Sequence, residues 1–280
     1  MKHQDKKVLT MQDISCFGQC SLTVALPIIS CCGIETAILP SAVLSTHTGG
    51  FSGWTFRDLT DDVPAIADHW EKEGLSFDAI YTGYLGSARQ IEMVKDLFAR
   101  LAAPDCVKIV DPAMADNGKL YYGFDEAYAH AVGALCGAAD IALPNITEAA
   151  MMTDSPYIGS GYDESYVRML MDKVLALGTK TVVITGVCYK PGQLGIAILS
   201  QGDEKITYYY HEKLDKSCHG TGDIFASAFT GALVRGKAPL EAARVAGNFT
   251  LAAMKETAEG HWYGAQFEKA FPVLMAELEK

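Results

Sequence analysis

One short segment combines glycine, threonine and aspartate, residue types that together could catalyse phosphoryl transfer. Gly220–Asp223 reads Gly-Thr-Gly-Asp and leads directly into an apolar run with helical character. The two glycines let the backbone approach a ligand closely, and the free amides at a helix start form an anion site. A carboxylate in that first turn can take the proton of an attacking hydroxyl while the amides hold a transferred phosphoryl group. A glycine turn whose aspartate only caps the helix has the same residues, so both interpretations stay open at this point.

Acidic and amide side chains follow two short apolar runs further toward the N-terminus. Asp111 and Asp116 come directly after Val107–Val110, and Asn145 and Glu148 follow a second run of the same kind. Carboxylates at this spacing could hold Mg²⁺ through water, as nucleotide sites prefer. Asp-Pro and Asn-Gly are also ordinary turn dipeptides, and an acid early in a helix complements its dipole, so each segment alone also fits a structural role.

Two further polar, glycine-rich segments could close over a small ring. His47 and Thr48 lie in the stretch Ser45–Gly50, and Tyr84 lies between Gly83 and Leu85. Such residues can donate hydrogen bonds to ring substituents or offer an aromatic face. A plain turn is the alternative for each segment. The three tryptophans are expected in the core: Trp54, Trp70 and Trp262.

The elements that must position these residues alternate between short Val- and Ile-rich runs and longer segments of helical period. This pattern is typical of βα units around a mainly parallel sheet, where ligands bind at the carboxyl ends of the strands. Strands are expected at Lys7–Ile14, Glu35–Leu39, Ala79–Thr82, Val107–Val110, Ile141–Leu143 and Thr181–Thr185, with an edge hairpin of Leu194–Ser200 and Lys205–His211. Helices are expected at Ser21–Cys31, Asp62–Glu73, Ala88–Leu101, Ala127–Cys136 and Tyr166–Leu177. No linker or repeat interrupts the pattern, which predicts one domain over residues 1–280.

Composition narrows the classes of function. The 280 residues are 49% hydrophobic and 20% charged, which is the mix of a folded globular protein. The net charge of −11 disfavours binding to nucleic acid or to an anionic membrane surface, and an anionic substrate would need a metal ion or oriented amides. Eight scattered cysteines without zinc spacing, and no signal peptide, predict a cytoplasmic protein.

Taken in order along the chain, these motifs resemble the pyridoxal kinase branch of the ribokinase-like vitamin and sugar kinases. The resemblance runs from Gln12 and the Gly18 turn to the helix after Asp223. It implies a three-layer α/β fold, with helices on both faces of the sheet. It also implies ATP-dependent phosphorylation of the 5′-hydroxymethyl group of a B6 vitamer (pyridoxal, pyridoxamine or pyridoxine), for salvage of pyridoxal phosphate.

The same resemblance implies a role for each motif residue. The base would be Asp223, beside an anion hole of Gly220, Thr221 and Gly222. The magnesium ligands would be Asp111, Asp116 and Glu148, and the nucleotide would also contact Asn145 and Thr185. The ring would be framed by Asp13, His47, Thr48 and Tyr84. Family members are commonly homodimers, and a monovalent cation such as K⁺ is left open as a further cofactor.

One departure from the family pattern bears on specificity. After Gln12 the family usually has serine, whereas this chain has Asp13. A carboxylate there could pair with a protonated ring nitrogen or with the amine of pyridoxamine, which leads to the hypothesis that the amine vitamer is preferred. The alternative is that Asp13 only caps a turn.

Two other functions compete with the B6 vitamer kinase. A hydroxymethylpyrimidine kinase of thiamine synthesis shares the fold, but those enzymes usually have cysteine at the position of Asp223. A non-catalytic vitamer-binding protein has no chemical reason to keep a base beside an anion hole.

Overall fold

The computed structural model describes residues 6–280, so the first five residues of the expected domain lie outside it. Its main strands are β1 (Lys7–Ser15), β2 (Glu35–Leu44), β3 (Phe56–Asp58), β4 (Phe77–Thr82), β5 (Ala102–Val110), β8 (Ile141–Ala142), β9 (Thr181–Val187), β10 (Gln193–Ser200) and β11 (Thr207–Glu212). Over these residues they form one nine-stranded sheet in the order β11-β10-β9-β8-β5-β4-β1-β2-β3. Pairing is parallel from β2 to β9, and the outer pairs β2–β3, β9–β10 and β10–β11 are antiparallel. The mainly parallel sheet and its edge hairpin are therefore confirmed.

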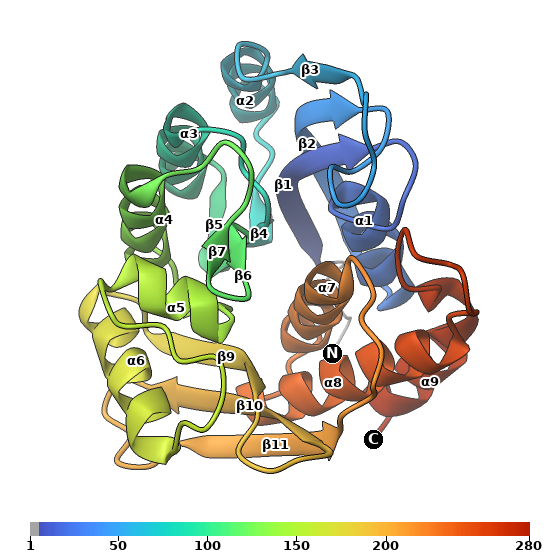
Figure 1. Ribbon diagram of the computed structural model, residues 1–280. Coiled ribbons are helices and arrows are strands. Elements are labelled where there is room, and N and C mark those ends of the chain that lie inside the picture. The colour runs from blue at the N-terminus through green and yellow to red at the C-terminus, as the bar shows by residue number, and fades with distance from the viewer. Residues whose placement is uncertain (1–5) are drawn as a thin grey trace.

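Helices cover both faces of this sheet and make three layers (Figure 1). They are α1 (Leu22–Cys31), α2 (Val63–Lys72), α3 (Ala88–Arg100), α4 (Glu126–Gly137), α5 (Ile146–Met152), α6 (Glu164–Ala176), α7 (Thr221–Val234), α8 (Pro239–Glu256) and α9 (Phe271–Leu278), with the short 3₁₀ helix η1 (Phe267–Ala270) before α9. One hydrophobic core lies between the sheet and α2 to α6. The other core lies under α1, α7, α8 and α9.

The central strands are apolar on both sides because each faces a layer of helices. In β1, Leu9 belongs to one core and Val8 to the other, and both side chains are fully buried. The same alternation holds for Val182 and Val183 in β9. A period of two between the faces, with apolar residues at both positions, is the sequence signature of a buried parallel strand.

The structure adds two features that the sequence pattern did not predict, and one of them is the edge strand β3. Within the segment expected to be a post-strand loop, β6 (Ala115–Asp116) and β7 (Lys119–Leu120) form a small antiparallel hairpin. Its turn consists of Asn117 and Gly118, with φ of 51° and 76°. Positive φ at both central residues is what a tight hairpin turn requires, and Asn-Gly supplies it at low cost. Among residues 6–280, no helix has the length and the apolar character needed to cross a membrane.

Candidate active site

The glycine segment forms the start of α7 and leaves its amides available to a ligand. Gly220 has φ of 76°, and a Cβ there would lie 1.8 Å from the carbonyl oxygen of Gln19, so only glycine fits. The helical ladder begins where Ile224 N–H donates to Gly220 O at 2.9 Å. The amides of residues 221–223 therefore precede the ladder and can bind an anion. A Cβ on Gly222 would meet nothing within 4 Å, so its backbone faces open space.

Asp223 lies in the first turn of α7 as a half-buried carboxylate. Burial raises the pKa of Asp223 to about 7, an effect that the backbone amide of Ser21 opposes and the nearby charge of Asp13 increases. A base works best when its pKa lies near the working pH. The structure thus gives the predicted base a suitable pKa and an adjacent row of amides.

Asp13 lies beside this base, at the end of β1. Its side chain is only 4% exposed, and Ser15 Oγ donates to Asp13 Oδ2 at 2.9 Å. Burial raises the pKa of Asp13, and the hydroxyls of Ser21 and Ser15 oppose that shift. Tyr84 is close enough that burial first and the charge of Asp13 second raise the pKa of the Tyr84 hydroxyl to about 12. Asp13 therefore lies close enough to Tyr84 and to Asp223 for its charge to act on both.

His47 is held by backbone groups at both ring nitrogens. Its Nδ1 accepts from Gly49 N–H at 3.1 Å, and its Nε2 lies 2.9 Å from the carbonyl oxygen of Tyr263, to which it donates. Burial lowers the pKa of His47, which favours the neutral ring that these two contacts need. His47 thus joins two loops and can offer a ligand only its ring face, while the neighbouring Thr48 is exposed.

Two buried carboxylates lie near Asp223, one at the end of β5 and one at the start of α5. Asp111 follows β5 and Glu148 lies in the first turn of α5. Burial and the neighbouring charges of Glu148 and Asp223 raise the pKa of Asp111. Glu148 Oε2 accepts from Asn145 N–H at 2.8 Å, and Glu148 Oε1 accepts from Met114 N–H at 3.1 Å. Asn145 and Glu148 together form a capping box, so the helix-start interpretation is correct for their local structure.

A cavity of about 210 Å³ opens beside these carboxylates, at the carboxyl ends of β8 and β9. Its lining includes three of the predicted nucleotide or metal residues: Asp116, Asn145 and Thr185. Thr185 is placed by a bridge to Asn145, and its N–H donates to Pro144 O at 3.0 Å. Lys213 also lines the cavity and is the one basic residue among those described there. The cavity therefore combines polar groups with a cation, which suits a phosphorylated ligand.

The three predicted metal ligands do not form a ready-made metal site. Among residues 6–280, no group of three or more His, Cys, Asp or Glu side chains is arranged to hold a metal ion. Asp111 and Glu148 do face each other, whereas the exposed Asp116 is held at the hairpin turn by Asn117, whose N–H donates to Asp116 Oδ1 at 2.9 Å. Mg²⁺ commonly binds one or two carboxylates together with substrate phosphates and water. The pair Asp111 and Glu148 fits such an ion because each buried charge needs a counter-charge.

Two features of this region were not found from the sequence. Lys213 stands in a polar run after β11, and nothing in the run marks it out from Lys216. The prediction that Trp262 packs in the core is wrong, because its side chain is 51% exposed. Trp262 instead lies against Phe51, with ring centroids 4.5 Å apart, on a loop that contacts the His47 segment. No periodic pattern in residues 258–264 could have shown this position.

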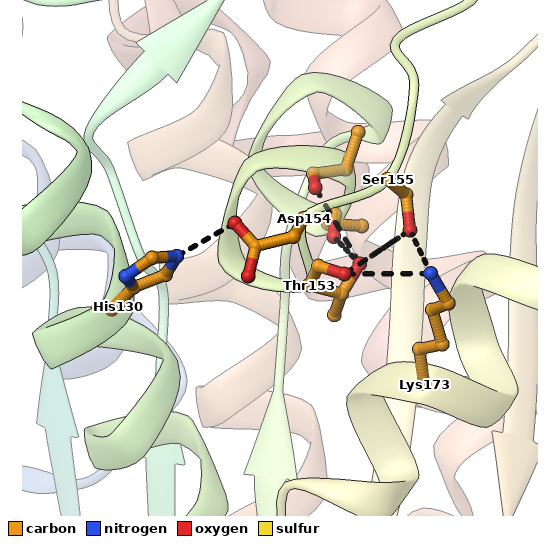
Figure 2. Close-up of polar contacts among 7 residues, drawn as sticks. His130, Thr153, Asp154, Ser155 and Lys173 are labelled. Carbon is orange, nitrogen blue, oxygen red and sulfur yellow. Dashed lines mark hydrogen bonds and ion pairs between the residues drawn. The ribbon is translucent and has the colours of Figure 1, made fainter.

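A separate polar cluster lies at the far end of α5 and has no predicted site residue (Figure 2). His130 Nε2 lies 2.8 Å from Asp154 Oδ1, and Lys173 Nζ donates to Ser155 Oγ at 2.8 Å. These contacts join α4 and α6 to the turn after α5. Because these side chains pair with one another, we interpret the cluster as structural: its contacts hold the turn after α5 in place.

The fold and the site together define a ribokinase-like kinase, an enzyme that moves a phosphoryl group to a small-molecule alcohol. The sequence profile of the phosphomethylpyrimidine kinase family matches residues 63–266. The chain therefore belongs to this family, which confirms the resemblance of its motifs to the pyridoxal kinases.

Known proteins resemble the chain over nearly its whole length. A Bacteroides thetaiotaomicron crystal structure described as a phosphomethylpyrimidine kinase, solved with pyridoxal, has a TM-score of 0.91 and 35% identity, covering 97% of this chain and 96% of that one. Pyridoxal kinase from Lactobacillus plantarum has a TM-score of 0.88 and 29% identity, covering 97% of both chains. A pyridoxine/pyridoxal/pyridoxamine kinase of Bordetella bronchiseptica is 27% identical over 261 residues, covering 90% of this chain and 89% of the relative.

Proposed function

We propose that the chain is one kinase domain that phosphorylates the 5′-hydroxymethyl group of a B6 vitamer with ATP. The observation that carries the proposal is the start of α7, where Asp223 lies in the first turn beside amides that precede the helical hydrogen-bond ladder. Neighbouring charges support this assignment of roles, because, beyond the effect of burial, Asp13 raises the pKa of Tyr84 and of Asp223, and Asp223 raises that of Asp111. The pyridoxal-bound relative and the kinases similar in sequence support the choice of substrate.

In this proposal each group has one task. The carboxylate of Asp223 takes the proton of the substrate hydroxyl as that oxygen forms a bond to the γ-phosphorus. The bond from the γ-phosphorus to the bridging oxygen breaks, and ADP leaves with the electron pair. The amides of Thr221 and Gly222 hold the transferred group, and positioning of this kind supplies most of the acceleration in phosphoryl transfer.

The nucleotide end would hold the phosphates and a magnesium ion. Asp111 and Glu148 would bind Mg²⁺, with Asp116 reached through water, and the ion would neutralise phosphate charge when bound. Asn145 and Thr185 would contact the phosphates from the cavity, and Lys213 would add a positive charge there. The positive charge of Lys213 matters because the net charge of the chain is −11.

The ring end would select the vitamer. Asp13 is buried with two serine hydroxyls around it, which supports a role in binding beyond capping a turn. Paired with a protonated ring nitrogen or with the amine of pyridoxamine, its charge would be neutralised in the complex. We therefore propose a preference for pyridoxamine, which Asp13→Ser should remove; unchanged vitamer ratios in that variant would contradict the proposal. His47, Thr48 and Tyr84 would frame the ring.

The test is the turnover of four alcohols in parallel with Mg-ATP: pyridoxal, pyridoxamine, pyridoxine and hydroxymethylpyrimidine. We expect kcat/KM to be highest for a B6 vitamer. Turnover of the pyrimidine alone would instead assign the chain to thiamine synthesis, the alternative that the family's description supports. Vitamer binding without any turnover would make the chain a binding protein and contradict the mechanism.

Three further expectations come from the resemblance or, for the location, from the scattered cysteines. They are a homodimer, a cytoplasmic location and activation by a monovalent cation such as K⁺. Light scattering on the purified chain tests the first, and assays in K⁺ against a large organic cation test the third.

A further inference from the structure

The small hairpin of β6 and β7 is too short to hold its own position. Its strands pair over two residues each, Ala115 and Asp116 with Leu120 and Lys119. A two-stranded hairpin on its own is at best marginally stable in water. This hairpin nevertheless carries Asp116, which lines the cavity at the ends of β8 and β9. The position of the Asp116 carboxylate therefore depends on contacts from outside the hairpin.

The start of α5 provides one set of these contacts, and α5 lies beside the hairpin (Figure 1). Gly118 N–H donates to Thr147 Oγ1 at 3.1 Å, at the hairpin turn. Asn145 Nδ2 donates to the carbonyl oxygen of Ala115 at 2.8 Å, in β6. These two bonds fix the turn and the first strand of the hairpin against α5.

The ring of Tyr157 makes a further contact with the same turn. A Cβ added to Gly118 would lie 2.7 Å from both Cδ1 and Cε1 of Tyr157, so the ring packs directly on the glycine. Tyr157 is 39% exposed, and it lines the same cavity as Asp116 and Asn117. The ring therefore lies at the edge of the cavity and supports the turn that follows Asp116.

A buried hydroxyl fixes the backbone on both sides of Tyr157. Tyr166 Oη donates to the carbonyl oxygen of Pro156 at 2.8 Å and accepts from Ile158 N–H at 3.0 Å. Tyr166 belongs to α6 and is only 9% exposed. The Tyr157 side chain therefore starts from a backbone that α6 holds in place.

We propose that Tyr157 is a positioning residue whose ring fixes the hairpin turn and thereby holds the Asp116 carboxylate at the nucleotide cavity. The proposal rests on the proposed function, which gives Asp116 its role at the nucleotide end. Without the ring, the turn gains freedom and Asp116 no longer meets the bound nucleotide in one fixed position. Binding of a magnesium nucleotide should therefore weaken, whereas binding of the vitamer at the other end of the site should not change.

The first test measures the Kd of ADP in the presence of Mg²⁺ by titration calorimetry, without vitamer. Tyr157→Ala should raise this Kd about 5- to 20-fold, the size of effect expected when one contact to a charged group is weakened. Tyr157→Phe keeps the ring and should match the wild type. Tyr122→Ala is the control, because Tyr122 follows the same hairpin and is 91% exposed. An unchanged Kd in folded Tyr157→Ala, or an equal rise in Tyr122→Ala, would overturn the proposal.

Steady-state kinetics separate positioning from a general loss of structure. In Tyr157→Ala, KM for ATP should rise about as much as the Kd, while KM for pyridoxal should stay within about twofold of the wild type. An equal rise in both KM values would overturn the proposal. Hydrogen exchange on the ligand-free protein gives a second structural measurement: the amides of residues 115–120 should exchange faster in Tyr157→Ala than in Tyr122→Ala. Equal exchange in the two variants would also overturn it.

A double-mutant cycle tests whether Tyr157 acts through Asp116. In an Asp116→Asn background, Tyr157→Ala should change the Kd of magnesium ADP by less than about twofold, because the carboxylate that the ring positions is gone. The full increase in that background would overturn the proposal. Neither the Kd nor the exchange rate requires turnover of a vitamer. Wild-type protein that binds magnesium ADP without phosphorylating a vitamer would thus overturn the proposed function, while these two measurements still decide the role of Tyr157.

Discussion

Gly222 and Gly231 lie on the same helix, α7, and their replacement by alanine should have opposite effects. A Cβ added to Gly222 would have no protein atom within 4 Å, whereas a Cβ added to Gly231 would lie 2.4 Å from the Sγ of the buried Cys32. Gly222→Ala should therefore be accepted by the fold and should fill the space in front of the anion-binding amides. Gly231→Ala should disturb the packing of α7 on α1 and leave the site alone.

The magnitudes follow from these surroundings. Alanine in a helix is more stable than glycine by about 0.5–1 kcal/mol, so Gly222→Ala should raise the Tm by roughly 1–3 °C. A methyl group that displaces the phosphoryl group from its donors should cost about 3–4 kcal/mol of barrier, or about 10²- to 10³-fold in kcat. Gly231→Ala overpacks a buried contact, at about 1–3 kcal/mol of folding stability.

The assay pairs thermal melting with coupled detection of ADP release at saturating vitamer and Mg-ATP. We expect Gly222→Ala to melt at or above the wild-type temperature with kcat reduced at least about 100-fold. Gly231→Ala should melt lower and, below its Tm, should keep wild-type kcat. Activity of Gly222→Ala within about threefold of the wild type would refute the location of the phosphoryl group at this helix start.

Three other substitutions test single groups. Asp223→Asn should lower kcat about 10²- to 10⁴-fold and keep vitamer binding, measured by fluorescence titration, because only the base is lost. Asp13→Asn should raise the Tm more at about pH 8 than at about pH 5. Folding raises the pKa of Asp13, so the wild type loses folding stability as the pH rises and the carboxyl ionises. Asparagine has no ionisable group, so the variant does not lose stability in this way. Lys213→Ala should raise KM for ATP about tenfold while KM for the vitamer stays constant, with Lys213→Arg as the charge-conserving control.

Each of these three predictions has an outcome that would contradict it. Turnover by Asp223→Asn near the wild-type rate would remove that residue from proton transfer. A Tm difference for Asp13→Asn that is the same at about pH 5 and about pH 8 would show that folding does not raise the pKa of Asp13. An equal rise in both KM values for Lys213→Ala would point to a general distortion of the site.

The parts of the site that the sequence predicts are those whose chemistry is local. The Gly220–Asp223 segment is contiguous, so its turn, its free amides and its acid can be recognised from four residues. Asn145 and Glu148 form a capping box three residues apart, which is equally local. The parallel strands also follow from short apolar runs, because burial on both faces leaves a continuous pattern.

The parts that the sequence does not predict depend on distant contacts or on backbone angles. Lys213 reaches the cavity at the ends of β8 and β9 only because the hairpin of β10 and β11 returns the chain to that part of the sheet. The ring nitrogens of His47 are occupied by backbone groups, one of them 216 residues away in the chain. Ser21 has a positive φ that cannot be read from its residue type, because glycine would be the expected residue there.

The most direct test of the central claim follows the phosphoryl group itself. ATP labelled at the γ-phosphoryl group is incubated with pyridoxamine, Mg²⁺ and either the wild type or Asp223→Asn, and the products are separated by mass. The account predicts that the label appears on the 5′-oxygen of the vitamer with the wild type and is nearly absent with the variant. Label that stays on ATP, or that appears only as free phosphate, with wild-type protein shown to bind the vitamer would contradict it.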